Sequence, residues 1–130
     1  MSDIVKSFIG ALGEVESGGS VDRIADLFAG DAEIGNVTLV KSGRGVDGAR
    51  EFWTHYQQTV GTVKSEFRKL ADGNVVALEW RTTGEALDGK AVDYEGVSII
   101  ETDGEKITRF FAYFDPKRFG LEIGGKAQHG

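Results

Sequence analysis

Three Asp-Gly pairs in the second half of the chain constrain its fold more than any other feature of the sequence. They occur at 72–73, 88–89 and 103–104, and each stands between stretches rich in apolar residues. Asp-Gly is the strongest short-range signal for a β-hairpin, because both residues tolerate the positive φ angles that tight turns need. The spacing therefore predicts a four-stranded antiparallel meander, with strands at 62–71, 74–86, 90–102 and 106–114.

Helical periodicity occupies the first half of the chain. Apolar residues recur every three or four positions over 4–15, 21–28 and 49–60, which is the spacing of one face of an amphipathic helix. A short strand is predicted within 32–40. Helices followed by a long sheet predict the α+β class, with the helices packed on the concave face of a curved antiparallel sheet.

The composition is that of one globular domain. We place this domain at 1–120 of the 130 residues, followed by a loose Gly-rich tail at 121–130. The net charge of −6 disfavours binding to nucleic acid or to anionic membranes. The absence of cysteine excludes disulfides and thiolate metal sites, and it favours the reducing cytoplasm. With only two histidines, no metal site is predicted.

Three strings in the sequence resemble those of a known family, the SnoaL-like branch of the nuclear transport factor 2-like superfamily. They are LFAGDAEIGN, GRGVDGAREFW and DGEKITRFFAYFDP, and the resemblance runs over about residues 4–120. It implies a cone-shaped α+β roll around an apolar pocket, similar to ketosteroid isomerases, polyketide cyclases and limonene-epoxide hydrolases. Because this fold hosts unrelated reactions and non-catalytic binders, the resemblance implies the fold more strongly than the function.

The catalytic residues of those relatives carry over at one position only. Alignment with the epoxide hydrolases places their Arg and first Asp at Glu79 and Arg81, and their second Asp at Ala112. The Tyr and Asn that help them to hold water fall at Ile34 and Asn36. The base of the ketosteroid isomerases also falls at or near Asn36, and an amide cannot abstract a proton. Neither mechanism is therefore predicted for this chain.

Glu79 and Arg81 are the candidate catalytic residues. They lie two apart on a predicted strand, so their side chains share one face. A two-residue turn at Asp88-Gly89 would place them opposite Ser98 and Gly96, whose small size leaves room for a ligand. In the pocket, Glu79 would act as a base or acceptor and Arg81 as an anion clamp. On the outer face, the two would instead form a solvated salt bridge, with their apolar neighbours inside.

Seven further residues are predicted to line the pocket, as walls or as polar groups. Asn36 either orients a ligand or closes a turn, and Tyr94 is expected to supply a hydroxyl. His55 lies either on the helix surface or near the pocket rim, where it could act as a base. The predicted pocket residues are Asn36, Trp53, Tyr56, Tyr94, Ser98, Phe110 and Phe114.

Two functions from different classes fit the sequence. The first is a SnoaL-like enzyme, an isomerase, cyclase or hydrolase, that acts without a cofactor on a small apolar oxygenated substrate. The second is a non-catalytic ligand-binding or dimerisation module of the same fold. An enzyme is expected to hold buried groups with perturbed pKa values in the pocket, whereas the pocket of a module is expected to be closed by Phe and Leu. A homodimer through the outer sheet face is expected in either case.

Overall fold

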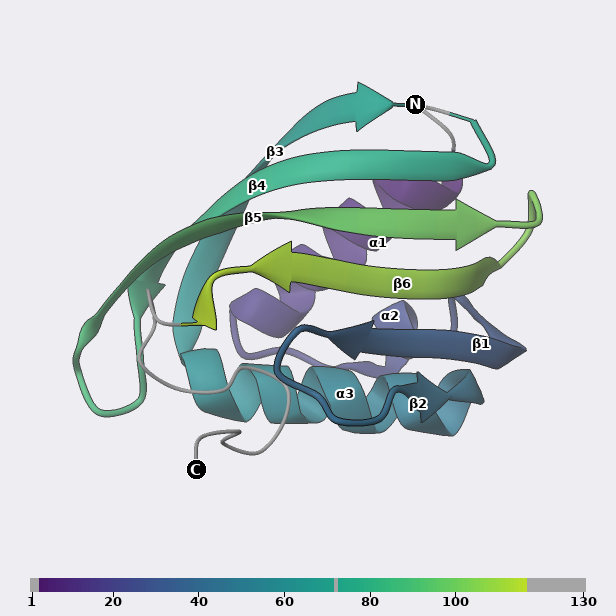
Figure 1. Cartoon of the computed structure of the whole chain (residues 1–130). Helices are drawn as coiled ribbons and strands as arrows, with labels where there is room; N and C mark the ends of the chain where they lie inside the picture. Colours follow the sequence, from purple (N-terminus) through teal and green to yellow (C-terminus); the bar gives the residue numbers. More distant parts are fainter. Residues whose placement is uncertain (1–2, 72, 117–130) are drawn as a thin grey trace.

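The computed structural model describes residues 3–71 and 73–116 (Figure 1). The predicted tail at 121–130 lies outside the described residues. None of the helices in the described part of the chain is long and apolar enough to cross a membrane. The elements follow in the order α1 (Asp3–Glu16), α2 (Asp22–Ala25), β1 (Phe28–Asn36), β2 (Gly43–Arg44), α3 (Gly45–Val60), β3 (Thr62–Ala71), β4 (Val75–Glu85), β5 (Ala91–Thr102) and β6 (Ile107–Phe114).

The strands form one curved sheet in the order β2-β1-β6-β5-β4-β3. Strands β3 to β6 follow one another as antiparallel neighbours, which confirms the meander predicted from the Asp-Gly pairs. Strand β1 pairs with β6 in parallel, and β2 extends the sheet beyond β1. Figure 1 shows the sheet curving around α1 and α3, so the α+β class with helices on the concave face is confirmed.

The core lies between the helices and the concave face of the sheet. Helix α1 buries Phe8 and Leu12 at a spacing of four residues, and α3 buries Trp53 and Tyr56 at a spacing of three. The strands bury alternate residues, as a sheet with one solvated face requires. The inward positions of β4 are filled by Val76, Leu78, Trp80 and Thr82.

The second helix is shorter, and the first strand begins earlier, than the sequence predicted. Helix α2 ends at Ala25, and β1 begins at Phe28. The backbone N–H of Ile107 donates to the carbonyl of Leu27 (2.8 Å), and Phe28 aligns with Ile107 in the parallel pair. Pairing with a distant strand therefore overrides the helical spacing that continues locally as far as Phe28.

The hairpin between β4 and β5 closes with a three-residue loop, where the sequence predicted two residues. The N–H of Ala86 donates to the carbonyl of Lys90 (2.9 Å), and the N–H of Gly89 donates to the carbonyl of Ala86 (2.9 Å). Gly89 has a φ of 86°, the left-handed conformation that ends such loops. The additional loop residue shifts every cross-strand pair between β4 and β5 by one position.

This shift changes the neighbours of the candidate catalytic pair. Glu79 lies opposite Val97, and Arg81 lies opposite Glu95, not opposite the small residues that a two-residue turn would give them. Both positions belong to the outer face of the sheet, since the residues that alternate with them on β4 are buried.

Candidate functional site

A cavity lies between the concave face of the sheet and the helices. Its free volume for the centres of water molecules is about 40 Å³, which is room for roughly two or three waters. Ser65, Phe67 and Phe114 line it and are partly exposed, so the cavity reaches the surface beside them. The lining includes all seven residues predicted for the pocket, Asn36, Trp53, Tyr56, Tyr94, Ser98, Phe110 and Phe114.

Aromatic rings form much of the cavity wall. The ring of Trp53 packs edge-on against Tyr56 and Phe110, with centroid distances of 5.5 and 5.3 Å. On the sheet, Trp80 packs edge-on against Tyr94 at 5.1 Å. Both tryptophans of the chain therefore belong to this wall. A wall of this kind favours a largely apolar ligand held by a few polar groups.

A buried carboxylate lies behind this wall. Glu16 ends α1 and is 3% exposed. Its Oε2 accepts hydrogen bonds from the hydroxyls of Tyr56 (2.6 Å) and Ser65 (2.6 Å), and its Oε1 accepts one from the backbone N–H of Ser65 (3.1 Å). Burial raises the pKa of Glu16 above its ordinary value of 4.5, although these hydrogen bonds lower it.

Two arms of hydroxyl groups lead from Glu16 to the cavity. In the first, the Tyr56 hydroxyl is hydrogen-bonded to that of Tyr94. In the second, the Ser65 hydroxyl lies 2.6 Å from that of Thr82. All four of these residues line the cavity. Thr82 and Tyr94 are cross-strand partners on β4 and β5, so the two arms end side by side on the inner face of the sheet.

The order of protons along the arms follows from the charge of Glu16. An ionised carboxylate only accepts, so Tyr56 and Ser65 each donate their one hydroxyl proton to it. Each of these two oxygens then accepts from the next hydroxyl, which makes Tyr94 and Thr82 the donors at the far ends. Burial raises the pKa of Tyr56 and of Tyr94, so both phenols stay protonated at neutral pH.

Asn36 closes a turn, which was one of the two alternatives left open by the sequence, and it also lines the cavity. Its Oδ1 accepts from the backbone N–H (2.8 Å) and the hydroxyl (2.6 Å) of Thr38. On the sheet, the indole Nε1–H of Trp80 donates to the Ser98 hydroxyl (2.9 Å). Both polar residues predicted beside Tyr94 are therefore held in place by hydrogen bonds.

Trp53 differs from Trp80 in this respect. Its side chain is 3% exposed, and its buried Nε1 has no hydrogen-bond partner within residues 3–71 and 73–116. The Nδ1 of His55 is also buried without a partner there, but His55 lines a separate surface groove with Asp47 and Arg50. Among the described residues, no cluster of three or more His, Cys, Asp or Glu side chains could hold a metal ion.

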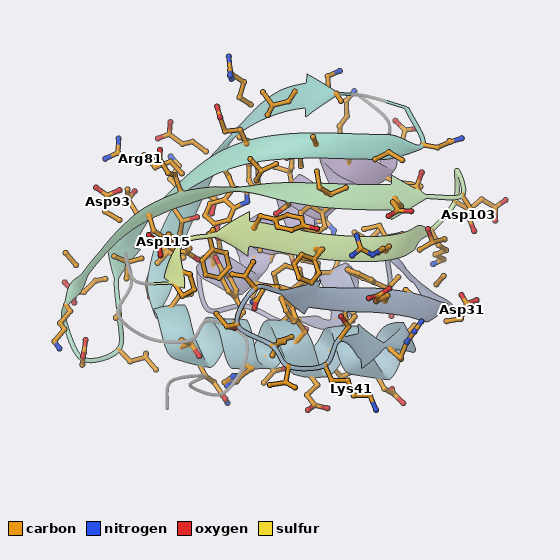
Figure 2. The ribbon with its side chains drawn as sticks, in the orientation of Figure 1. Asp31, Lys41, Arg81, Asp93, Asp103 and Asp115 are labelled. Carbon is orange, nitrogen blue, oxygen red and sulfur yellow. The ribbon has the colours of Figure 1, made fainter. Side chains whose placement is uncertain are left out.

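Glu79 and Arg81 lie outside the cavity, which corrects their predicted place in the pocket. Their side chains are 49% and 62% exposed. Arg81 donates two hydrogen bonds to Asp93 (3.0 and 2.8 Å), and Glu79 accepts one from Arg68 (3.2 Å). Figure 2 shows Arg81 and Asp93 together on the outside of the sheet. The physical reason is that side chains alternate between the two faces along β4. Its large apolar side chains take the inward positions, which leaves the outward positions to Glu79 and Arg81.

Glu16 was missed by reasoning from the sequence, although the sequence carries a signal for it. Glu16 follows Phe8 and Leu12 at intervals of four residues, which places a carboxylate on the apolar stripe of α1. A charge at such a position must find donors inside the protein. Of the residues predicted for the pocket, Tyr56 is a partner of that charge, and Trp53 and Tyr94 contact Tyr56.

Several solved structures are similar to this chain. A hypothetical protein from Catenulispora acidiphila has a ketosteroid isomerase-like fold and was crystallised in complex with trimethylamine. It is 17% identical, with a TM-score of 0.75 and 88% of each chain covered. TerC, co-crystallised with polyporic acid, is 18% identical, with a TM-score of 0.75 over 91% of this chain and 95% of its own. A putative SnoaL-like polyketide cyclase from a Jannaschia species is 13% identical, with a TM-score of 0.73 over 96% of each chain.

Identities this low show the shared fold alone. None of the curated proteins matches the sequence. The model of the SnoaL-like domain family, however, matches residues 9–110. The matched range contains Glu16, most of α1 and every later element as far as the middle of β6. The chain therefore belongs to the SnoaL-like domain family.

Proposed function

We propose that this SnoaL-like domain is an enzyme that binds a small, largely apolar, oxygen-bearing molecule in the cavity and moves a proton on it, as an isomerase or a cyclase does. The observation that supports this most is the line of hydroxyl groups that ends on Glu16 behind an aromatic wall. A cavity closed by Phe and Leu alone would have favoured a binding module. The proposed reaction needs no cofactor.

Glu16 is the proposed proton acceptor, and Tyr94 and Tyr56 carry the proton to it. A C–H bond beside an electron-withdrawing oxygen group of the substrate breaks, and its proton goes to the Tyr94 oxygen. In the same step the Tyr94 proton passes to Tyr56, and the Tyr56 proton passes to Oε2 of Glu16. Both tyrosines end neutral, Glu16 ends protonated, and the electron pair stays on the substrate. The reverse movement returns the proton to the product.

The surroundings of Glu16 suit this role. Burial raises its pKa, so the carboxylate takes a proton more readily than one in water does. The raised pKa values of Tyr56 and Tyr94 keep them protonated, so they can pass protons on but are poor bases themselves. Two proteins of the same fold were crystallised with small molecules, trimethylamine and polyporic acid, which supports a small-molecule ligand for this domain without identifying it.

Exchange of carbon-bound hydrogen with deuterium tests the proposal without knowledge of the natural substrate. In D₂O, the protein is expected to accelerate the loss of the ¹H NMR signals next to the carbonyl of small cyclic ketones. Glu16→Gln and Tyr56→Phe are each expected to lower the exchange rate by roughly 10²–10⁴-fold. Glu79→Gln makes the same chemical change on the outer face and is expected to retain the rate. Wild-type exchange in Glu16→Gln would show that the proposed relay is wrong.

A non-catalytic binding module is the rival proposal, and it is distinguished by binding without exchange. Trp53 and Trp80 are the two tryptophans of the chain, and both line the cavity, so intrinsic fluorescence reports on its occupancy. Quenching by a ligand that undergoes no exchange, with equal affinity in the wild type and Glu16→Gln, would favour the module.

We also propose a homodimer through the outer face of the sheet. Apolar side chains gather there on adjacent strands, with Val97 opposite Tyr113 and Ile99 opposite Phe111. Tyr113 is 47% exposed, and the other three are partly exposed. An apolar area of this kind on a sheet face is typical of an interface. For the compartment, the lack of cysteine supports the cytoplasm.

A further inference from the structure

We infer that the cavity selects a small ligand whose positive charge lies on an alkylated ammonium group. This inference rests on the proposed function and deepens it, because it names the chemical class of the substrate. It concerns the charge of the bound ligand and not the movement of a proton, so the two proposals can be tested apart.

The first observation is that the charge of Glu16 has no opposite charge beside it. The carboxylate is 3% exposed, and its partners are the hydroxyls of Tyr56 and Ser65 and one backbone N–H. Within residues 3–71 and 73–116, no Lys, Arg or His forms an ion pair with it. Hydrogen bonds from neutral groups spread a charge but do not cancel it, so ionised Glu16 gives the adjoining cavity a negative potential.

The lining of the cavity contains nothing that opposes this potential. None of the fifteen described residues that line it is charged at neutral pH. Arg68 and Arg81 lie on the outer face of the sheet, where Glu79 and Asp93 pair with them. Solvent screens those exposed charges, whereas Glu16 acts through the less polarisable interior. An anion in the cavity would therefore meet the charge of Glu16 and find no basic partner.

The aromatic wall favours a cation for an independent reason. Nine of the fifteen lining residues are Phe, Tyr or Trp. The face of an aromatic ring is its negative side and attracts a cation within about 6 Å of the ring centre, most strongly in Trp. A buried cation loses its hydration, and an aliphatic wall could not offset that loss. Rings together with a nearby carboxylate can offset it.

The rest of the cavity narrows the kind of cation. Each hydroxyl of the two arms directs its proton toward Glu16, so the oxygens of Tyr94 and Thr82 remain as acceptors at the far ends. Alkyl groups weaken the hydration of an ammonium ion and pack on rings, so an alkylated ammonium suits this wall better than an inorganic ion. A cationic nitrogen near the reacting carbon also acidifies its C–H bond, which suits the proposed reaction.

Titration with two matched probes tests the inference. Tetramethylammonium and tert-butanol have the same number of non-hydrogen atoms and similar shapes, but only the first is charged. Both tryptophans of the chain line the cavity, so their fluorescence reports binding. At pH 8 and constant ionic strength, tetramethylammonium is expected to bind roughly tenfold more tightly than tert-butanol. Trimethylacetate, an anion of similar shape, is expected to give no response at the same concentrations.

Glu16→Gln removes the charge and keeps the shape of the side chain. It is expected to lower the affinity for tetramethylammonium roughly tenfold and to leave that for tert-butanol within about twofold, which also checks the fold. Glu79→Gln, the same change at an exposed site, is expected to alter neither affinity. If Glu16→Gln does not fold, the pH dependence of the wild type decides. Its affinity for tetramethylammonium is expected to rise above about pH 4.5 as Glu16 ionises, because the raised pKa values of Tyr56 and Tyr94 keep these two groups of the lining protonated.

The outcomes separate this inference from the proposed function. Equal affinities for tetramethylammonium and tert-butanol, or a tetramethylammonium affinity that is unchanged in a folded Glu16→Gln variant, would overturn the cation site. Deuterium exchange of neutral ketones that depends on Glu16 would leave the proposed function standing in that case. Selective binding of tetramethylammonium by a protein that shows no exchange would support the cation site and reject the relay.

Discussion

At the scale of single residues, Glu16 is a charge compensated by hydroxyl groups and one backbone N–H. Buried carboxylates usually need either a positive partner or several donors. Three hydrogen bonds from Tyr56 and Ser65 reach Glu16, yet its pKa is raised, because loss of hydration outweighs them. The folded protein therefore binds a proton at this site more tightly than the unfolded chain does.

The stability of the protein is expected to depend on pH through Glu16. Below about pH 4.5, the ordinary pKa of the group, the carboxyl is protonated in both states. As the pH rises above this value, the unfolded chain releases the proton first, so the free energy of unfolding falls until the folded pKa is passed. Denaturant titrations should show wild type losing stability relative to Glu16→Gln as the pH rises above about 4.5. A constant difference between the two proteins would contradict the raised pKa.

Arg81 and Arg68 are expected to behave alike when each is replaced by alanine. Both form exposed ion pairs on the outer face, with Asp93 and Glu79. Solvent screens such pairs, and ordering two long side chains offsets most of the attraction. Thermal denaturation of Arg81→Ala and Arg68→Ala should therefore give small and similar shifts. A much larger loss for Arg81→Ala would show that its pair is structurally important.

The pocket residues could be predicted from the sequence, whereas the partners of Glu16, the proposed proton acceptor, could not. Trp53 and Tyr56 follow from helical spacing, and Phe110 and Phe114 share a strand face, so local patterns place them. Glu16 meets its partners Tyr56 and Ser65 across 40 and 49 residues of sequence. No local pattern encodes such a meeting, and it depends on how α1 packs on α3 and β3.

At the scale of elements, the turns could be located but their lengths could not. Asp-Gly marks a hairpin, yet it is compatible with a two-residue loop and with a three-residue loop that ends on Gly. In the β4–β5 hairpin the three-residue loop occurs, with Gly89 at a φ of 86°. This one-residue difference in loop length decides which residues of β5 lie opposite Glu79 and Arg81. The parallel pairing of β1 with β6 had no local signal either.

Two glycines on different elements are expected to respond oppositely to alanine. A Cβ at Gly96 of β5 would lie 2.4 Å from the carbonyl oxygen of Tyr113 and 2.7 Å from the Trp80 ring. Gly96→Ala should therefore destabilise the fold, by about 1–3 kcal/mol if only overpacking contributes. It should also change Trp80 fluorescence.

Gly13 provides the matched control for this experiment. It lies in α1, and a Cβ there meets nothing within 4 Å. Gly13→Ala should stabilise the protein by about 0.5–1 kcal/mol, because glycine gives up more backbone freedom in a helix than alanine does. Urea denaturation of both variants gives the comparison. Equal effects at the two positions would mean that the close approach at Gly96 can relax.

At the scale of the whole molecule, one face of the sheet meets the helices and the other does not. The proposed homodimer would cover the apolar area at Val97, Ile99, Phe111 and Tyr113. Light scattering should then give twice the chain mass of 14.0 kDa. Phe111→Glu should shift the mass to that of a single chain, since an unpaired charge in an apolar interface is costly.

A charge placed on an exposed apolar residue outside the proposed interface is the control for that measurement. Val40 is 85% exposed and lies in the segment between β1 and β2, outside the proposed interface. Val40→Glu should leave the mass unchanged. A mass of one chain for the unaltered protein at high concentration would reject the dimer.

The central position of β6 in the sheet bears on how the protein is synthesised. Residues 37–106 are added to the growing chain between β1 and β6, which takes roughly 4–14 s at about 5–20 residues per second. Throughout that time, β1 lacks its neighbour β6, and β5, which is added near the end of it, lacks the same neighbour until β6 follows. Unpaired strand edges are the places where other chains add. The yield of folded protein should therefore depend on how well nascent chains are kept apart until β6 emerges from the ribosome.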